Sequence, residues 1–360
     1  MSCASNVCRC VWRVISVGTV MCLLVGIASA QDSSGIKYPT FGAIERKDPA
    51  FDKLLPKDAK LEKLASGFEW AEGPLWCKKE VPGSRVAGPA PYLLFSDIPP
   101  NRIMKWSPGT TKSVVFMHPA GYTGTKPRGG EPGTNGLTLD KEGHLVACDH
   151  GDRRLYRLQS DGTKKTLVDR YEGNRLNSPN DLCYKSNGDL YFTDPPYGLE
   201  KNWDDPAREL DFCGVYRLGK DGKVTLLTKE LTRPNGIGFS PDEKTLYVAQ
   251  SDPAAAIWRA YDVKDDGTIT NSRVFFDATE WAKAGRKGLP DGFKIDKDGN
   301  LWASGPGGLV VLDKNGKHLG TIDTGEATAN CAWGGDGGML YVVADMHIAR
   351  IKTSTKGAGW

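Results

Sequence analysis

The sequence predicts an all-β protein, a six-bladed β-propeller with a metal site on its axis. Three observations support this fold. The 360 residues include 43 Gly, 22 Pro, 10 Trp and 12 Tyr, which is typical of many short strands joined by tight turns. Six segments can be aligned with one another, and each carries an oxygen-bearing side chain at the same place.

The repeat extends from about residue 64 to residue 352. Each unit has a polar residue beside a small one, a short apolar strand, a D-x-x-G or S-x-G turn, and one or two further strands before another turn. The second unit reads GTNGLTLDKEGHLVACDHGDRRLYRLQSDG. A parallel β-helix would need shorter and more uniform coils, and a β-sandwich would not show six aligned units. The pattern therefore favours six antiparallel blades, with the Trp and Tyr residues of the strands packed between them.

The polar residue that opens each unit is a carboxylate or an amide, and these residues recur about 40 to 60 residues apart. Because the innermost strand of every blade starts at the same end of the channel, we expect the side chains to converge there. Carboxylate and amide oxygens favour Ca²⁺, Mg²⁺ or Mn²⁺ over softer metals, and the mixture suits Ca²⁺ best. Ordinary turn chemistry is the alternative, but turns would accept Ser, Gly or Lys equally well. The six residues are Glu72, Asn135, Asn180, Asn235, Asp291 and Asn330.

Two insertions interrupt the repeat. One spans Lys78 to Pro91 within the first unit, and the other spans Phe116 to Thr134 between the first and second units. The second insertion contains GYTGTKPRGGEPG, which lacks the G-K-[ST] ending of a phosphate-binding loop and leads into no helix. We expect it to be a flexible lid over the channel.

The first thirty residues have the pattern of a secretory signal peptide. Arg9 and Arg13 precede the apolar run VISVGTVMCLLVGIASA, which ends in an Ala-x-Ala cleavage site. The run is short for a membrane anchor, and no second apolar stretch follows. The predicted organisation is a signal peptide over 1–30, an N-terminal extension over 31–61 and a propeller hydrolase domain over 62–355. The mature protein is expected to be exported, periplasmic or secreted, with no membrane association after cleavage.

Charge and cysteine content exclude some classes of function. The chain has 47 basic and 44 acidic residues, and removal of the signal takes two basic residues away, so the mature protein is close to neutral. This balance predicts no nucleic-acid partner. Five cysteines remain without a CxxC motif, so we expect no disulfide scaffold, although one pair could form. The expected partner is a small molecule, and the expected state is a monomer or weak dimer.

Five motifs together resemble the SMP-30/gluconolactonase/luciferin-regenerating family, from about Leu64 to Lys352. They are E-G-P at Glu72, S-P-N-D at Asn180, P-N-G at Asn235, P-D-G at Asp291 and Y-F-T-D-P-P-Y-G from Tyr191. The resemblance implies a six-bladed propeller with one axial divalent cation, and it is strongest to the bacterial gluconolactonase branch.

The same resemblance implies roles for individual residues. Glu72, Asn235 and Asp291 would bind the cation, most simply Ca²⁺, with Zn²⁺, Mg²⁺ and Mn²⁺ as alternatives. Asn180 would be either a further ligand or a contact to the substrate. The implied activity is hydrolysis of a sugar lactone such as gluconolactone to the aldonic acid, which is cleavage of a carboxylic ester bond.

Residues near the predicted channel mouth are candidates for substrate binding. His150 follows the middle strand of the second unit, and Asp194 and Tyr197 follow the equivalent strand of the third. Each could contact substrate or be structural at a strand end, and Asn135 joins them as a candidate contact. The sequence contains neither a G-x-S-x-G nor an H-E-x-x-H motif, so no other catalytic machinery competes.

The predicted mechanism is attack of water on a lactone carbonyl that the cation polarises. Asp291 is the candidate general base, and Glu72 is the alternative. A phosphotriesterase-like hydrolase of the same superfamily would use the same site on a phosphorus centre. A non-catalytic ligand-binding propeller with a structural Ca²⁺ is the alternative from a different class.

Overall fold

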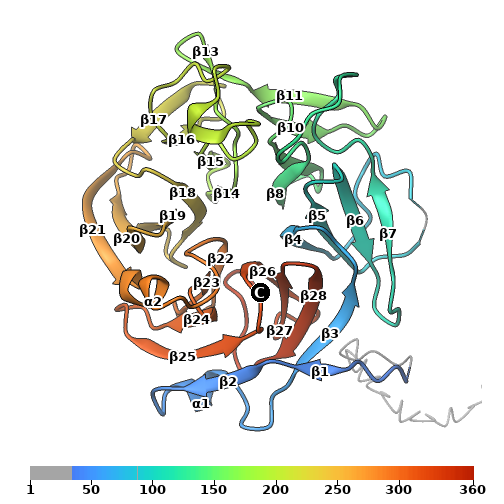
Figure 1. Cartoon of the computed structure of the whole chain (residues 1–360), viewed down its shortest axis with the longest axis vertical. Coiled ribbons are helices and arrows are strands. Elements are labelled where there is room, and N and C mark those ends of the chain that lie inside the picture. The colour runs from blue at the N-terminus through green and yellow to red at the C-terminus, as the bar shows by residue number, and fades with distance from the viewer. Residues whose placement is uncertain (1–34, 87) are drawn as a thin grey trace, which may run out of the picture.

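The computed structural model describes residues 35–86 and 88–360, so the predicted signal peptide lies outside the described residues. Six antiparallel sheets are arranged around a central channel like the blades of a propeller (Figure 1). The predicted fold class, an all-β six-bladed propeller, is therefore confirmed. Among the described residues, no helix has the length and apolar character that crossing a membrane requires.

The first four blades each contain four strands in chain order from the axis outward. Blade one contains β4 (Ala71–Cys77), β5 (Tyr92–Asp97), β6 (Arg102–Trp106) and β7 (Ser113–Met117), and blade two contains β8 (Thr134–Leu139), β9 (Leu145–Asp149), β10 (Arg154–Leu158) and β11 (Lys164–Val168). Blade three contains β14 (Leu182–Tyr184), β15 (Leu190–Asp194), β16 (Gly214–Leu218) and β17 (Val224–Thr228). Blade four contains β18 (Pro234–Phe239), β19 (Thr245–Asp252), β20 (Ala255–Val263) and β21 (Ile269–Asp277).

The last two blades each gain a fifth strand from the N-terminal region. Blade five contains β22 (Phe293–Ile295), β23 (Leu301–Gly305), β24 (Gly308–Leu312), β25 (His318–Asp323) and β2 (Ala43–Arg46), and blade six contains β26 (Thr328–Gly334), β27 (Met339–Ala344), β28 (His347–Lys352), β3 (Leu61–Ser66) and β1 (Thr40–Phe41). The remaining elements are the hairpin β12 (Arg170–Tyr171) and β13 (Asn174–Arg175), the helices α1 (Phe51–Leu54) and α2 (Thr279–Lys283), and a 3₁₀ turn at Asn202–Asp204.

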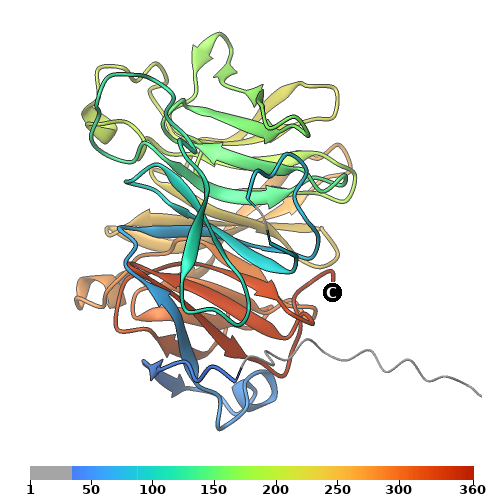
Figure 2. The same cartoon turned by 90° about the vertical axis from the view of Figure 1, so that its right-hand side faces the viewer.

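The N-terminal segment closes the ring. Strand β3 pairs with β28, so the sixth blade is built from both ends of the propeller domain, as Figure 2 shows from the side. Arg350 on β28 donates to Glu62 on β3 at 2.7 Å. Upstream of β3, Phe51 is fully buried, and its ring lies 6.3 Å from that of Trp302 in blade five. The described part of the extension is therefore packed against the outer edges of the last two blades.

Aromatic side chains fill the spaces between blades, as the sequence predicts. Trp106, Trp258 and Trp302 are among the largest fully buried side chains. Trp76 of blade one stacks on Tyr341 of blade six, with ring centroids 4.9 Å apart. Burial of rings of this size is the main favourable contribution to blade packing.

Hydroxyl groups join neighbouring blades close to the axis. Ser96, Thr193 and Ser304 occupy the same place on the second strand of their blades, and each donates to a backbone carbonyl at the start of the next blade. The bonds are Ser96 Oγ to Asn135 O, Thr193 Oγ1 to Asn235 O and Ser304 Oγ to Ala329 O, each 2.7 Å long. They fix the height at which the inner strands meet the channel.

In four of the six blades a glycine follows the repeated polar residue, and the neighbouring inner strand lies too close to it for a side chain. A Cβ atom on Gly236 would lie 2.3 Å from the carbonyl oxygen of Asp291, and one on Gly73 would lie 2.1 Å from that of Asn135. Gly236 does not have a positive φ, so its N-G dipeptide is part of an inner strand and not a hairpin turn. The strand register shifts beside these residues in blades one, two, four and six, as is usual where a strand bends to redirect a side chain.

We therefore expect Gly236→Ala to lower the free energy of unfolding by about 1 to 3 kcal/mol, because the added methyl group overlaps the backbone of the next blade. Gly129→Ala is the matched control, since a Cβ there would meet no atom within 4 Å. Urea unfolding followed by circular dichroism measures both variants. Equal stability of the two would show that the inner strands can separate without cost.

Candidate functional site

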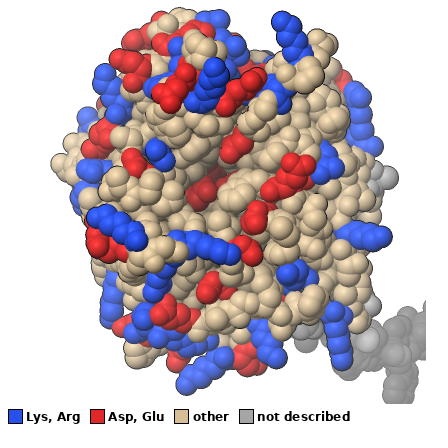
Figure 3. Space-filling model, viewed as in Figure 1, with Lys and Arg blue, Asp and Glu red and all other residues tan. Residues whose placement is uncertain are grey.

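A cavity of about 390 Å³ opens at the end of the channel where the inner strands begin. Figure 3 shows the corresponding hollow at the centre of this face, with acidic side chains inside it. Six of the residues that the sequence singled out line the cavity: Glu72, Asn135, Asn180, Tyr197, Asn235 and Asp291. The structure thus brings together oxygen donors from five different blades.

The sixth repeated residue, Asn330, does not line the cavity. It lies behind Glu72, and its Nδ2 donates to Glu72 Oε2 at 3.3 Å. Its Oδ1 accepts from the backbone N–H of Cys331 at 2.8 Å and lies 3.3 Å from Nζ of Lys294. Asn330 therefore orients the Glu72 carboxylate from a position behind the cavity lining.

Several amide and carboxylate oxygens of the cavity have no hydrogen-bond partner among the described residues. Asn235 donates its Nδ2 to Ser251 Oγ at 3.0 Å, which leaves its Oδ1 for the cavity. Oδ1 of Asn180 and Oδ1 of Asp291 are buried and have no hydrogen-bond partner. Buried oxygens without partners are costly unless a donor or a cation meets them. This donor set fits a hard divalent cation, with Glu72, Asn180, Asn235 and Asp291 as the residues that could hold it.

The carboxylates of the cavity repel one another. Burial, followed by the charge of Asp181, raises the pKa of Glu72 to about 7. Burial, followed by the charge of Glu72, raises the pKa of Asp291 well above its usual value. The charge of Lys294 and the hydrogen bonds from Gly73 and Asn330 lower the pKa of Glu72, but they do not offset the effect of burial. A bound cation would relieve this repulsion.

The walls of the cavity contain residues that the sequence did not reveal. Trp70, Glu131 and Arg233 line it, and the guanidinium of Arg233 lies 4.5 Å from the ring centre of Trp203. Tyr197 packs edge-on against the same Trp203, with ring centroids 5.5 Å apart. Arg233 directly precedes the P-N-G motif and could have been found as a flanking residue. Glu131 lies in an insertion, where no repeat points to it.

Two predicted substrate contacts lie outside the cavity lining. His150 is fully buried, and its Nδ1 lies 3.0 Å from Oε2 of Glu131, so it reaches the cavity only through that carboxylate. Asp194 is also fully buried and accepts from the backbone N–H of Asn177 at 2.8 Å. The equivalent strand ends carry Asp97, Asp149 and Asp252, which likewise accept backbone N–H groups. This recurrence indicates a structural role for Asp194.

The insertion expected to form a flexible lid is tied to the blades beneath it. Arg128 donates to the backbone of Gly151 at 3.0 Å, and the side chain of Asn101 donates to Tyr122 O at 2.9 Å. Thr123 Oγ1 donates to Asp152 at 2.7 Å. The segment is therefore a fixed wall of the cavity, and Glu131 is part of that wall.

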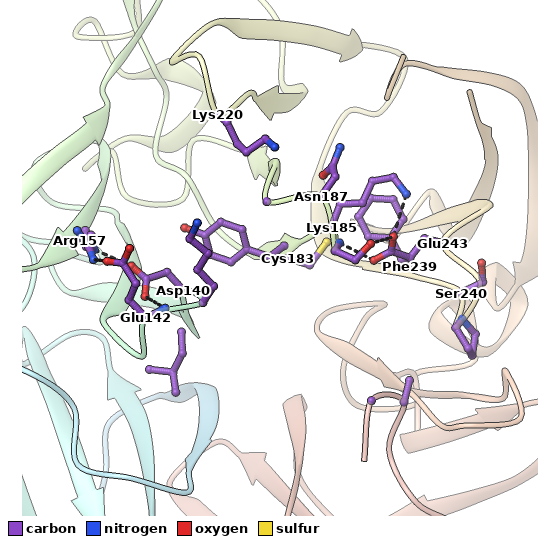
Figure 4. A pocket seen from close by; sticks show the side chains of 18 residues that line it. Asp140, Glu142, Arg157, Cys183, Lys185, Asn187, Lys220, Phe239, Ser240 and Glu243 are labelled. Carbon is purple, nitrogen blue, oxygen red and sulfur yellow. Dashed lines mark hydrogen bonds and ion pairs between the residues drawn. The ribbon is translucent and has the colours of Figure 1, made fainter. Parts of the chain in front are cut away.

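A larger cavity, of about 910 Å³, is lined by hairpin turns of blades two, three and four (Figure 4). Its carboxylates are already paired with cationic side chains: Arg157 contacts Asp140 at 2.6 Å, and Lys185 contacts Glu243 at 2.9 Å. Ligand atoms of Asp140, Glu142 and His144 lie within 4.8 Å of one another, but Arg157 also contacts Glu142. This cluster is thus balanced by a protein cation, unlike the carboxylates of the axial cavity.

Comparison with known proteins shows which family this chain resembles over most of its length. The sequence profile described as the SMP-30/Gluconolactonase/LRE-like region matches residues 70–345. The gluconolactonase of Zymomonas mobilis is 36% identical over 350 residues, which is 95% of each chain.

Solved structures extend the comparison. A gluconolactonase from Xanthomonas campestris is 30% identical, with a TM-score of 0.72 over 89% of this chain and 99% of that chain. The regucalcin of Agrobacterium tumefaciens, described as a calcium-binding protein, is 19% identical with a TM-score of 0.57 over 82% of this chain and 96% of that chain. The latter likeness shows the shared fold alone.

The buried Asp194 predicts a dependence of stability on pH. Burial raises its pKa from 3.8 to about 7, so between about pH 4 and 7 the folded state holds this proton more tightly than the unfolded chain does. The contribution of Asp194 to the free energy of unfolding therefore falls as pH rises through this window and is constant above it. In Asp194→Asn, this decrease in the free energy of unfolding with rising pH should be absent. Urea unfolding at several pH values measures the free energy of unfolding of both proteins. Asp58→Asn, at an exposed carboxyl, is the control, and equal pH profiles for both variants would contradict the assignment.

Proposed function

We propose that this chain, which belongs to the SMP-30/gluconolactonase/LRE-like family, is a metal-dependent lactonase that opens a sugar lactone such as gluconolactone to the aldonic acid. The chain is a lactone-hydrolysing carboxylic ester hydrolase, as its gluconolactonase relatives indicate. The dependence on a metal and the nature of the substrate are the proposed parts. We also propose that the protein is exported after removal of residues 1–30.

The single observation that carries the proposed metal dependence is the convergence of carboxylate and amide oxygens in the axial cavity. Glu72, Asn180, Asn235 and Asp291 present carboxylate and amide oxygens, and two of these oxygens are buried without a hydrogen bond. Four residues of this type suit Ca²⁺, which accepts an irregular shell of oxygen ligands. A cation held there would polarise a lactone carbonyl and stabilise the negative charge that develops on its oxygen.

The side chains of the cavity would perform the remaining steps. Asp291 or Glu72 could accept the proton of the attacking water, since both are carboxylates at the floor where the ester would lie. Ser251 fixes the amide of Asn235 and donates to the backbone of Pro290, so the floor is held before substrate arrives. Pre-organised groups of this kind need no rearrangement during the reaction.

A polyhydroxylated lactone suits the walls of the cavity. Arg233 offers hydrogen-bond donors, Tyr197 offers a hydroxyl group, and Glu131 offers acceptors, all around a space of about 390 Å³. Such a mixture of donors and acceptors matches a sugar ring better than an apolar lactone. The alternatives are a phosphotriesterase-like hydrolase with the same floor, and a propeller in which the cation is only structural.

The first test is an assay of D-glucono-δ-lactone, δ-valerolactone and a phosphotriester, each with and without a chelator. We expect lactone hydrolysis that chelation abolishes at a temperature where circular dichroism shows folded protein, and that added Ca²⁺ restores. If the cation were structural, chelation would lower the melting temperature and reduce activity only in proportion to unfolded protein. Folded, metal-free protein with full activity would refute the metal dependence, and preference for the phosphotriester would refute the substrate class.

The second test addresses the residues of the floor. Glu72→Gln and Asp291→Asn should each lower kcat at least about 100-fold, because each removes negative charge at the position of the cation. Glu243→Gln, at a carboxylate of the larger cavity, is the control and should retain activity. Near-normal kcat in both floor variants, with the fold intact, would show that the chemistry takes place elsewhere.

A further inference from the structure

We propose that Glu131 is a substrate-binding residue that accepts hydrogen bonds from the hydroxyl groups of a sugar lactone, and that His150 is the positioning residue that holds it. The inference rests on the proposed lactonase function and identifies the group that would select hydroxylated substrates. It concerns a residue outside the repeated motifs and outside the predicted metal ligands.

Glu131 is placed at the cavity by a fixed segment of chain. Its side chain is 34% exposed and lines the same cavity as Glu72 and Asp291. Three residues earlier, Arg128 donates to Gly151 at 3.0 Å. Two residues later, the carbonyl of Gly133 accepts from the backbone N–H of His150 at 3.1 Å. The backbone on both sides of Glu131 is therefore fastened to the top of blade two.

Glu131 is the charged group beside the imidazole of His150. The His150 side chain is fully buried, its Nδ1 lies 3.0 Å from Oε2 of Glu131, and within the described residues neither ring nitrogen forms a hydrogen bond. A buried polar ring without partners is costly, so contact with the carboxylate has a stabilising role. Gly198 packs so closely that a Cβ there would lie 2.6 Å from Cβ of His150, which prevents the side chain from moving away.

The closest contact between Glu131 and His150 is made by Oε2. We assign the other carboxylate oxygen, Oε1, to the substrate. A carboxylate accepts hydrogen bonds and donates none, whereas an unsubstituted lactone offers only acceptors. Hydroxyl groups of a sugar lactone are the donors that match Glu131. Arg233 also lines this cavity, and its N–H groups can donate hydrogen bonds to the hydroxyl oxygens of the substrate.

The experiment compares two substrates that share the ester but differ in hydroxyl groups. For Glu131→Ala we expect kcat/KM on D-glucono-δ-lactone to fall about 10- to 100-fold more than on δ-valerolactone, mainly through KM, because a hydrogen bond to a charged group is lost. Glu131→Gln, which keeps an acceptor oxygen, should lower the ratio of kcat/KM on the two lactones less than Glu131→Ala does. Glu142→Gln is the matched control, since Glu142 also lies beside a histidine, His144, but in the larger cavity.

The positioning role of His150 is tested by the ratio of kcat/KM on D-glucono-δ-lactone to kcat/KM on δ-valerolactone. His150→Phe should lower this ratio, as Glu131→Ala does. His150→Gln, whose amide can still donate to the carboxylate, should lower the ratio less. Circular dichroism checks the folding of each variant. The Glu131 variants decide the inference, because that side chain is partly exposed and its removal leaves no large buried void.

Wild-type protein without activity on any lactone would refute the proposed function, and the inference with it. Wild-type activity together with an unchanged substrate ratio in Glu131→Ala would refute the inference alone. In that case an equal loss on both lactones would assign Glu131 to the chemistry itself, and no loss on either would remove it from the site.

Discussion

The close approach of the inner strands around the axis is the constraint on which the site depends. In four blades a glycine after the repeated polar residue lets the backbone of one blade touch the start of the next, as at Gly236 against Asp291. With the strands so close, the preceding side chain has little space except the channel. Carboxylates and amides from five blades therefore meet in one small volume. The glycines of the N-G and D-G dipeptides are therefore required for the packing of neighbouring blades, apart from any role of the preceding side chains in chemistry.

This packing creates an electrostatic problem that the protein does not solve with its own residues. Glu72 and Asp291 are both buried; burial and then the charge of Asp181 raise the pKa of Glu72, and burial and then the charge of Glu72 raise the pKa of Asp291. The larger cavity shows the contrasting solution, in which Arg157 and Lys185 neutralise the nearby carboxylates. In the axial cavity, a cation from solution is the simplest remaining way to balance the charge.

Most of the floor could be predicted from the sequence because the repeat maps position in the chain onto position around the axis. The repeat also has limits. Asn330 occupies the sixth equivalent position but bonds to Glu72 from behind. Asp194 is a predicted substrate contact because it belongs to the Y-F-T-D-P-P-Y-G motif, although Asp97 and Asp149 at the same strand position indicate a structural carboxylate. Alignment of the strand ends, in addition to the strand starts, would have separated these roles.

The walls could not be predicted because they come from segments that do not repeat. Glu131 belongs to an insertion, and its relation to His150 arises only when the chain folds back over blade two. Repeated segments supply identical geometry to every member of the ring, so they are suited to holding one ion and one ester carbonyl. Insertions can change without disturbing the inner strands. The parts of this fold that select a substrate are thus free to vary while the floor, constrained by ring closure, stays as it is.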